Sequence, residues 1–224
     1  MAEARSGPPR RNRLIGRTIN NLVARVPWAW AILRGPTRRF FSERAAEWDE
    51  RTGAGSADHL AALAAAALHV SPAPERILDV GCGTGAGTLF LSREFPQARV
   101  RGLDISEEMI ALAVAKVGLD PEGRVAFKVG DASALPYPDE SFDLVAQLNM
   151  PPFFAELARV LRPGGQVIVA ASWGEDTPFH TSPKLLRWKF LQHGIEPVEI
   201  GRAGPGDFYV GRKEAMAPPP SAAP

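Results

Sequence analysis

The chain of 224 residues is long enough for one substantial α/β domain with an extension, and 45% hydrophobic and 23% charged residues are typical of a globular protein. Its single cysteine, Cys82, excludes an intrachain disulfide and is compatible with a reducing compartment. No apolar run is long enough to cross a bilayer, and the first residues lack the apolar core of a secretory signal, so we expect a cytoplasmic protein.

The net charge of +1 hides an uneven distribution along the chain. Residues 1–44 hold ten arginines against two glutamates, a net charge of +8, which leaves −7 for the remainder. Polybasic arms of this kind contact nucleic acid or anionic lipid in other proteins, so the partner of this arm is an open question. Residues 1–13 are rich in Pro, Gly and Arg and residues 214–224 in Pro and Ala, and both composition biases predict disordered tails.

Residues 14–55 are expected to form a helical extension or lid. Apolar residues recur at helical spacing over 14–26 until Pro27 interrupts the pattern, and a short aromatic turn or helix is expected at 28–30. The apolar face of the first helix has three interpretations: it packs on the domain, it covers an active site, or it rests on a membrane surface. Peripheral membrane contact through this basic helix therefore remains open.

The stretch ILDVGCGTGAG at residues 77–87 joins a short apolar strand to a turn in which every second residue is glycine. The apolar run predicts a strand buried on both faces, and the glycines indicate a backbone that bends sharply and comes close to a ligand. A helix is predicted directly after the turn, so its unpaired N–H groups would face the same crevice. Two ligands fit. Gly81, Gly83 and Ala86 satisfy a relaxed NAD fingerprint, whereas the carboxylate of Asp79 at the mouth of the turn suits a cationic ligand.

Acidic residues follow the next two predicted strands. The second strand, at 98–103, ends at Asp104, which is 23 residues after the first glycine of the turn, close to the interval at which an acid meets a ribose in βαβ nucleotide sites. The third strand, at 124–129, leads to Asp131, whose ionised carboxylate only accepts hydrogen bonds and so suits an exocyclic amine; an Asx-turn is the alternative. Together with Asp79, these acids would lie at the carboxyl ends of the strands, where open α/β sheets bind ligands.

The motif DVGCGTG, the acid after the second strand and the string GDASALPYP resemble the class I S-adenosylmethionine-dependent methyltransferases, in particular the type 11 and quinone-biosynthesis members. The resemblance runs from about residue 41 to residue 213. It implies a Rossmann-like α/β fold with a seven-stranded, mostly parallel sheet, an antiparallel last strand, helices on both faces and a methyltransferase domain at 56–213. It further implies S-adenosylmethionine as the cofactor, bound by Asp79, Gly81, Gly83, Gly85, Asp104, Ile105, Met109, Asp131, Ala132 and Leu148. Packing in the core is the alternative role for Met109.

The string LNMPPF at 148–153 directly follows the predicted fourth strand, where the family binds its acceptor. It resembles the Asn-Pro-Pro-aromatic motif of amino-methylating relatives, which nominates Asn149 and Phe153 for substrate contact. Met150 interrupts that motif, so the positions of the amide groups are left open. A turn near the substrate without amide chemistry is the alternative.

Two further side chains are candidates on the acceptor side. His180 lies in a loop predicted at 173–183 and is a candidate general base, because histidine titrates near neutral pH; a solvated loop histidine is the alternative. By resemblance, Trp48 belongs to the segment that lies near the cofactor ahead of the main domain, and simple packing is its alternative. His180 and Asn149 are the only catalytic candidates.

The string ARVLRPGG at 158–165 predicts the end of a helix at Arg162, because proline cannot continue the helix and glycine supplies a left-handed exit. A fifth strand is expected at 166–172. A last helix at 183–193 and two strands at 196–201 and 207–211 complete the sequence pattern.

By resemblance, the expected function is methyl transfer from S-adenosylmethionine, without a metal, to oxygen, nitrogen or carbon of an acceptor. The loops after the fourth and fifth predicted strands are short and no additional domain is evident, which favours a small molecule and disfavours nucleic acid. An NAD(P)-binding oxidoreductase and a non-catalytic S-adenosylmethionine-binding protein are the alternatives.

Overall fold

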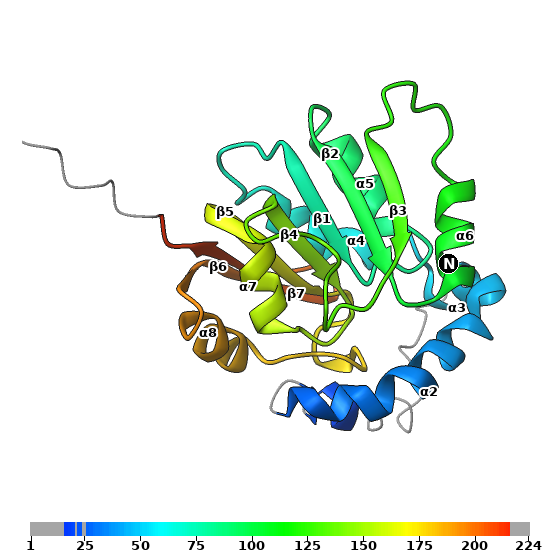
Figure 1. The fold of residues 1–224 in the computed structure, drawn as a ribbon, viewed down its shortest axis with the longest axis horizontal. Helices are drawn as coiled ribbons and strands as arrows, with labels where there is room; N and C mark the ends of the chain where they lie inside the picture. The colour runs from blue at the N-terminus through cyan, green and yellow to red at the C-terminus, as the bar shows by residue number, and fades with distance from the viewer. Residues whose placement is uncertain (1–15, 21, 24–25, 216–224) are drawn as a thin grey trace, which may run out of the picture.

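The structure is a computed structural model that describes residues 16–20, 22–23 and 26–215. The tails expected at 1–13 and 214–224 lie outside the described residues, apart from residues 214 and 215. The described residues form a sheet of seven strands in the order β3-β2-β1-β4-β5-β7-β6 (Figure 1). The strands are β1 (Arg76–Val80), β2 (Arg99–Asp104), β3 (Val125–Val129), β4 (Phe142–Leu148), β5 (Leu161–Ala171), β6 (Ile195–Ala203) and β7 (Gly206–Lys213).

The sheet is parallel from β3 to β5, whereas β7 is antiparallel to both of its neighbours, β5 and β6. This confirms the expected fold class, including the antiparallel last strand. Because β1 to β5 point the same way, their carboxyl ends meet at one edge of the sheet, and the strand order reverses direction between β1 and β4. A ligand crevice is expected at that reversal.

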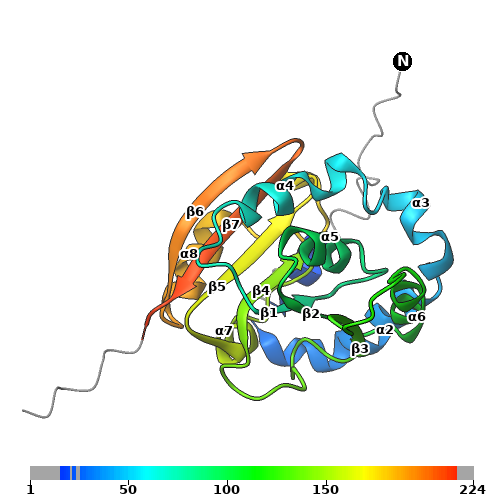
Figure 2. The same cartoon turned by 90° about the horizontal axis from the view of Figure 1, so that it is seen from above.

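Helices cover both faces of the sheet (Figure 2). One face carries α4 (Ala57–Ala67), α5 (Ala86–Glu94) and α6 (Glu107–Ala115), and the other carries α7 (Phe154–Val160) and α8 (Pro183–Leu191). Ser56 and Ser106 cap α4 and α6, because their side chains accept hydrogen bonds from backbone N–H groups of the first turn. A short 3-10 helix, η3 (Gly174–Asp176), lies in the loop between β5 and α8.

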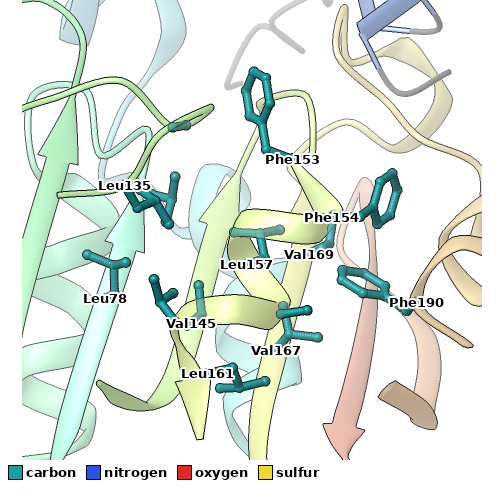
Figure 3. Packing of buried hydrophobic residues seen from close by; sticks show 14 of the residues in the cluster. Leu78, Leu135, Val145, Phe153, Phe154, Leu157, Leu161, Val167, Val169 and Phe190 are labelled. Atoms are coloured by element: carbon teal, nitrogen blue, oxygen red, sulfur yellow. The ribbon is translucent and has the colours of Figure 1, made fainter. Parts of the chain in front are cut away.

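Two apolar clusters hold the helices on the sheet. Leu78 of β1 belongs to the same buried cluster as Val145, Leu157 and Phe190, on the α7 and α8 side (Figure 3), while its neighbour Ile77 belongs to the cluster on the α4 and α5 side. Successive strand residues point to opposite faces, so a continuous apolar run is what a strand covered on both faces requires. Each fully buried side chain of this size stabilises the fold by about 1.5–3 kcal/mol.

The N-terminal segment forms helices that run along the carboxyl-end edge of the sheet (Figure 1). They are η1 (Pro27–Ala29), α2 (Trp30–Ser42), η2 (Ala45–Glu47) and α3 (Trp48–Thr52). The short aromatic helix predicted at 28–30 corresponds to η1. Helix α2 lies within the helical extension expected over 14–55, but its own bounds were not predicted, since Gly35 and Pro36 ordinarily interrupt helices. Of the helix predicted over 14–26, residues 16–20 and 22–23 are helical and the others lie outside the described residues or outside the helix. Among the described helices, none is long and apolar enough to cross a membrane.

The predicted turn at Arg162–Gly165 is wrong in one respect. Helix α7 ends at Val160, and β5 begins at Leu161, so the Arg-Pro-Gly-Gly sequence lies within the strand. The pairing of β4 with β5 shifts register between Phe142 and Leu144, and Gly164 takes the positive φ of +77° that the sequence predicted. An irregular start to the strand therefore replaces the expected turn.

The connection from β3 to β4, residues 130–141, has no helix, whereas the other three crossovers between parallel strands carry α5, α6 and α7. On the side of α7, no helix lies over β1, β2 and β3 in the described part of the chain (Figure 1). The loop of residues 130–141 must therefore be positioned by side chains.

Arg159 of α7 positions this loop. Its guanidinium donates to the carbonyl oxygens of Leu135 and Tyr137 at 2.9 and 2.8 Å and pairs with the carboxylates of Glu156 and Asp139, both at 2.8 Å. Hydrogen bonds of charged groups are stronger than neutral ones, and a guanidinium presents several donors in a fixed plane. One side chain thus fixes both the loop and its distance from the sheet.

We expect Arg159→Met to lower the free energy of unfolding by about 2–3 kcal/mol, because the loop loses several charge-assisted hydrogen bonds at once. Urea denaturation measures this change. Arg93→Met on the exposed side of α5 is the matched control and should change stability by less than about 0.5 kcal/mol. Equal effects of the two substitutions would contradict the role of Arg159.

Candidate functional site

The glycine turn after β1 is held against the tip of β2. The backbone N–H groups of Gly81 and Cys82 both donate to the carbonyl oxygen of Leu103, at 2.7 and 3.0 Å. Gly81, Gly83 and Gly85 have φ angles of +71°, +53° and +87°, which only glycine adopts without strain. The turn predicted from the alternating glycines is present, and Gly85 directly precedes the first turn of α5.

Asp104 joins the glycine turn to the start of α6. One carboxylate oxygen accepts from the N–H of Gly83 at 2.9 Å, and the other accepts from the N–H of Ser106 at 2.9 Å. Burial raises the pKa of Asp104, and these two hydrogen bonds act in the opposite direction. Each carboxylate oxygen has two lone-pair sites, so both oxygens retain capacity for a ligand hydroxyl.

Asp79 is 2% exposed and lies beneath the same turn. Burial raises the pKa of its carboxyl to about 7, although the hydroxyl of Thr88, at 2.6 Å, favours the ionised form. The nearby carboxylate of Asp104 raises it further. Two acids with raised pKa values in one crevice indicate a place where a positive charge is favourable.

Asp131 is engaged by the N-terminal helix. Its Oδ1 accepts from the indole N–H of Trp30 and from the backbone N–H of Ser133, both at 2.8 Å, and Oδ2 lies 3.8 Å from the guanidinium of Arg34. The bond with Ser133 is the Asx-turn contact weighed as an alternative role for Asp131. The carboxylate nevertheless remains partly exposed at 21%, so Oδ2 is open to an additional donor.

Helix α3 covers the other side of the glycine turn. Asp49 accepts hydrogen bonds from the hydroxyl of Thr84 and from the ammonium of Lys116. The indole nitrogen of Trp48 lies 3.9 Å from the position that a Cβ would take at Gly83. Trp48 is therefore next to the turn, and its contact with a cofactor or substrate remains a prediction.

Met150 and Gln147, which the sequence did not nominate for the site, lie at the end of β4. The sulfur of Met150 occupies the space beside Gly81, 2.2 Å from where a Cβ would be, so a side chain at this position would displace Met150. Gln147 is 1% exposed and donates from Nε2 to the carbonyl oxygen of Met150 at 3.0 Å, while its Oε1 has no hydrogen-bond partner among the described residues. A buried acceptor without a donor is costly and indicates a site for a ligand donor.

Asn149 and Phe153 take positions that the broken motif did not predict. Asn149 has a φ of +60°. Its side-chain amide donates to the hydroxyl of Ser172 at 2.9 Å, accepts from the backbone N–H of Ser172 at 2.8 Å, and lies 3.5 Å from Nε2 of His59. Phe153 is buried in an edge-to-face contact with Trp30, with ring centroids 5.3 Å apart. Both side chains thus connect structural elements of the site, and their contact with a substrate remains a prediction.

His180 makes a hydrogen bond through Nε2 with the carboxylate of Asp207 at 2.9 Å, and its side chain is 8% exposed. Asp207 and Met150 line a hollow of about 10 Å³ together with Phe179. Space for about one water is too little for an acceptor molecule, so Met150 or Phe179 must move for one to enter here. The hollow connects the His180–Asp207 pair with the side chain that lies on the glycine turn.

The remaining predicted cofactor residues are placed around the crevice with different exposures. Met109 is 1% exposed and Ala132 is 7% exposed, whereas Ile105 and Leu148 are half-buried and border the apolar clusters. Near-complete burial of Met109 agrees with its alternative role in the core. No group of three potential metal-ligating side chains occurs in the part of the chain that was searched, which comprises the described residues.

A family model described as a methyltransferase domain matches residues 77–165. The O-methyltransferase cnsE of Penicillium expansum is 39% identical over 130 residues, which cover 54% of this chain and 46% of the relative. Demethylmenaquinone methyltransferase of Lactococcus lactis is 41% identical over 121 residues, or 50% of this chain and 48% of the relative. The chain therefore spans about half the length of the curated relatives it matches.

Solved structures match more of the chain at lower identity. A Haloferax volcanii putative methyltransferase, in a complex with the Trm112 methyltransferase activator, superposes with a TM-score of 0.64 and 22% identity, covering 78% of this chain and 97% of that chain. At this identity the match concerns the fold.

The buried carboxyl of Asp79 predicts a specific pH dependence of stability. Its pKa rises from an ordinary 3.8 to about 7 in the folded protein, so the folded state holds the proton more tightly than the unfolded state. Stability from this group is complete at low pH and is lost as pH rises through that window, by about 2 kcal/mol between pH 5 and pH 7.

Asp79→Asn keeps an acceptor for Thr88 but has no carboxyl to ionise. It should therefore lack the loss in free energy of unfolding that ionisation of Asp79 causes between pH 5 and pH 7, so the variant gains stability relative to the parent as pH rises. Urea denaturation at the two pH values measures the difference. Asp58→Asn, at an exposed position on α4, is the control and should follow the parent. A parallel pH profile for Asp79→Asn would contradict the raised pKa.

Proposed function

This chain belongs to the class I S-adenosylmethionine-dependent methyltransferase family, and we propose that it transfers the methyl group of S-adenosylmethionine to a small-molecule acceptor. The observation that carries the proposal is the juxtaposition of Asp104, Asp79 and the glycine turn at the reversal of strand order, in a chain whose relatives are methyltransferases. The domain organisation expected from the sequence, with an extension at 14–55 and the methyltransferase domain at 56–213, is part of this proposal.

The residues of the crevice fit the cofactor. Asp104 retains lone pairs for the ribose hydroxyls, and Asp131 retains an accessible oxygen for the adenine amine. Asp79 supplies negative charge beneath the turn. Oε1 of Gln147 is a buried acceptor without a hydrogen-bond partner among the described residues, and an ammonium group could donate to it. Met150 fills part of the space beside Gly81 with a flexible thioether that can turn aside.

When bound, S-adenosylmethionine supplies a methyl group on a positively charged sulfur. The work of the protein is to hold an acceptor in line with that methyl group and to exclude water, and well-oriented systems gain roughly 7–11 kcal/mol of the barrier in this way. Asp79 and Asp104 favour positive charge in the crevice. If the acceptor must lose a proton, His180 is the candidate to receive it at Nδ1, because its Nε2–H donates to the carboxylate of Asp207 at 2.9 Å.

A hydrophobic small molecule is the acceptor class that the surroundings favour. The side chains next to the small hollow are Met150 and Phe179, and Phe179 also contacts Phe41 with ring centroids 6.3 Å apart. One relative acts, by its name, on demethylmenaquinone, and another is an O-methyltransferase. Oxygen, nitrogen and carbon acceptors all agree with these surroundings. The NAD alternative is not favoured, because the relatives are methyltransferases.

The surface formed by η1 and α2 also supports peripheral contact with a membrane. Trp28 and Ile32 lie one turn apart and are 72% and 71% exposed, and the exposed Arg38 and Arg39 follow. Residues 27–42 contain no acidic side chain. Exposed apolar residues next to arginines are suited to the interface of an anionic bilayer, where a hydrophobic acceptor would be dissolved.

Transfer of a labelled methyl group from S-adenosylmethionine into fractionated cell lipids and metabolites tests the proposed function. We expect formation of S-adenosylhomocysteine with at least one fraction. Asp104→Ala should weaken S-adenosylhomocysteine binding by roughly 10- to 150-fold, or about 1.5–3 kcal/mol, since it removes an acceptor for the ribose. Isothermal titration measures this loss, and Glu94→Gln on α5 is the control.

Two outcomes would contradict the proposal. Binding of S-adenosylmethionine without turnover in any fraction would identify a non-catalytic binding protein. Binding of NAD with no heat from S-adenosylhomocysteine would identify the dinucleotide alternative.

For the membrane contact, we expect co-sedimentation with vesicles of phosphatidylcholine and phosphatidylglycerol and weaker binding to phosphatidylcholine alone. The double variant Trp28→Ser, Ile32→Ser should reduce the partition coefficient about tenfold, because two large apolar side chains no longer enter the interface. The control is Trp188→Ser, Leu191→Ser on α8, where both side chains are also exposed, at 54% and 44%. Equal losses in both double variants would rule out α2 as the contact surface.

A further inference from the structure

A hollow of about 660 Å³ lies at the amino ends of β1 and β2. These strand ends are at the edge of the sheet opposite to helix α2 (Figure 1). Three arginines line the hollow: Arg76 from β1, and Arg99 and Arg101 from β2. Every second residue of a strand points to the same face. Arg76 is two residues before Leu78, and Arg99 and Arg101 are four and two residues before Leu103, so all three arginines point to the face that carries α7, where Leu78 and Leu103 belong to the buried cluster. This is the region that the helix-free connection of residues 130–141 leaves without a helix.

The positive charges in this hollow outnumber the negative ones, because only Glu75 among its lining residues is acidic and Asp120 interacts electrostatically with Arg101 alone of the three arginines. Arg76 and Arg99 are direct partners across the β1–β2 pair, an arrangement that is unfavourable for like charges. Among the described residues, none of the three arginines has an ion pair within 4.0 Å, and the side chains of Arg76 and Arg99 make no hydrogen bond. Glu75 also lines the hollow, but at a greater distance than an ion pair requires.

Arg101 differs from the other two arginines because its guanidinium donates to the backbone oxygens of Val100 and Arg124, at 3.1 and 2.8 Å. It is therefore fixed in place, while Arg76 and Arg99 keep all their donors. The guanidinium of Arg76 lies 5.7 Å from the centre of the Phe142 ring, a cation–π arrangement that leaves its N–H groups open to a ligand. Two free guanidinium groups beside a fixed one form a ready receptor for an anion.

The opposite wall of the hollow is aromatic. Tyr137 and Phe142 pack edge to face with ring centroids 4.9 Å apart, and both line the hollow. Arg159 holds the backbone of Tyr137 through its carbonyl oxygen, so this wall is supported from α7. A ligand that fits needs two or more negative groups for the arginines and a flat or apolar part for the rings. The volume lies within the range of small-molecule sites.

We propose that this hollow is a second binding site, separate from the cofactor crevice, for a small organic polyanion with phosphoryl groups and a planar part. The arginines bind the phosphoryl oxygens, and the rings of Tyr137 and Phe142 contact the planar part. The site lies at the amino ends of the strands, whereas the crevice lies at their carboxyl ends. The proposal is therefore independent of whether the chain transfers methyl groups.

Isothermal titration of the full chain with inorganic pyrophosphate and with uridine diphosphate, in saturating S-adenosylhomocysteine to keep the crevice filled, tests the site. We expect both probes to bind, uridine diphosphate more tightly because its base contacts the rings. Arg76→Gln and Arg99→Gln should each weaken both probes about tenfold or more, since each removes a charged donor. Arg93→Gln, which removes one charge from the exposed side of α5, is the matched control and should leave binding unchanged.

The design separates a built site from general attraction of anions. Heat from neither probe at low salt would overturn the proposal. Equal weakening by Arg76→Gln, Arg99→Gln and Arg93→Gln would also overturn it, because net charge rather than the hollow would then explain binding. Phe142→Leu, which keeps the apolar core but shortens the aromatic wall, should weaken uridine diphosphate and leave pyrophosphate unchanged.

Discussion

The carboxylate of Asp104 is the constraint on which the site depends. Its two oxygens hold the N–H of Gly83 in the turn after β1 and the N–H of Ser106 at the start of α6, so one side chain fixes the distance between two parallel strand ends. Burial makes this carboxylate costly to ionise, and both backbone donors favour its charged form. The same group that shapes the turn therefore also keeps negative charge in the crevice, ready for a cationic ligand.

The N-terminal helices cover the crevice that lies at the carboxyl ends of the strands. Trp30 of α2 donates a hydrogen bond to Asp131. On α3, Asp49 accepts a hydrogen bond from Thr84, and Trp48 lies next to Gly83, so both helices contact residues of the crevice. The three interpretations of the basic arm are thus compatible with one another. An amphipathic segment can pack on the domain with one face, cover the crevice, and still present Trp28 and Ile32 to an interface with the other.

Much of the fold follows from local sequence patterns. Ile77, Leu78 and Val80 read as a strand covered on both faces because the side-chain period of a strand places them alternately in the two clusters. Asp79 and Asp104 were placed correctly at strand ends because turn glycines and strand lengths are local signals. The hydrogen bonds that they accept from Thr88 and from backbone N–H groups depend on three-dimensional proximity, which the local sequence does not reveal.

The features that the sequence did not predict arise from long-range packing. Helix α2 continues through Gly35 and Pro36 because tertiary contacts such as the Trp30 and Phe153 pair outweigh weak local propensity. The side chain of Met150, which merely interrupted a motif in the sequence, lies beside Gly81 in the glycine turn. The alternation of Arg99 and Arg101 in β2 is visible in the sequence, but only the missing crossover helix shows that they line a hollow.

The attachment of the N-terminal segment has a consequence for biosynthesis. Asn20 donates to the carbonyl oxygen of His180 and to the hydroxyl of Thr181, and Arg17 donates to the carbonyl oxygen of Glu175, which are separations of 158 to 161 residues. These N-terminal helical residues therefore find their partners only after residues 175–181 have been made. Contacts between such distant positions form late, because closing a long loop costs entropy before any contact repays it. A nascent chain would therefore have β1 to β5 made while its crevice was still uncovered, and these contacts would cover the crevice only once residues 175–181 had left the ribosome.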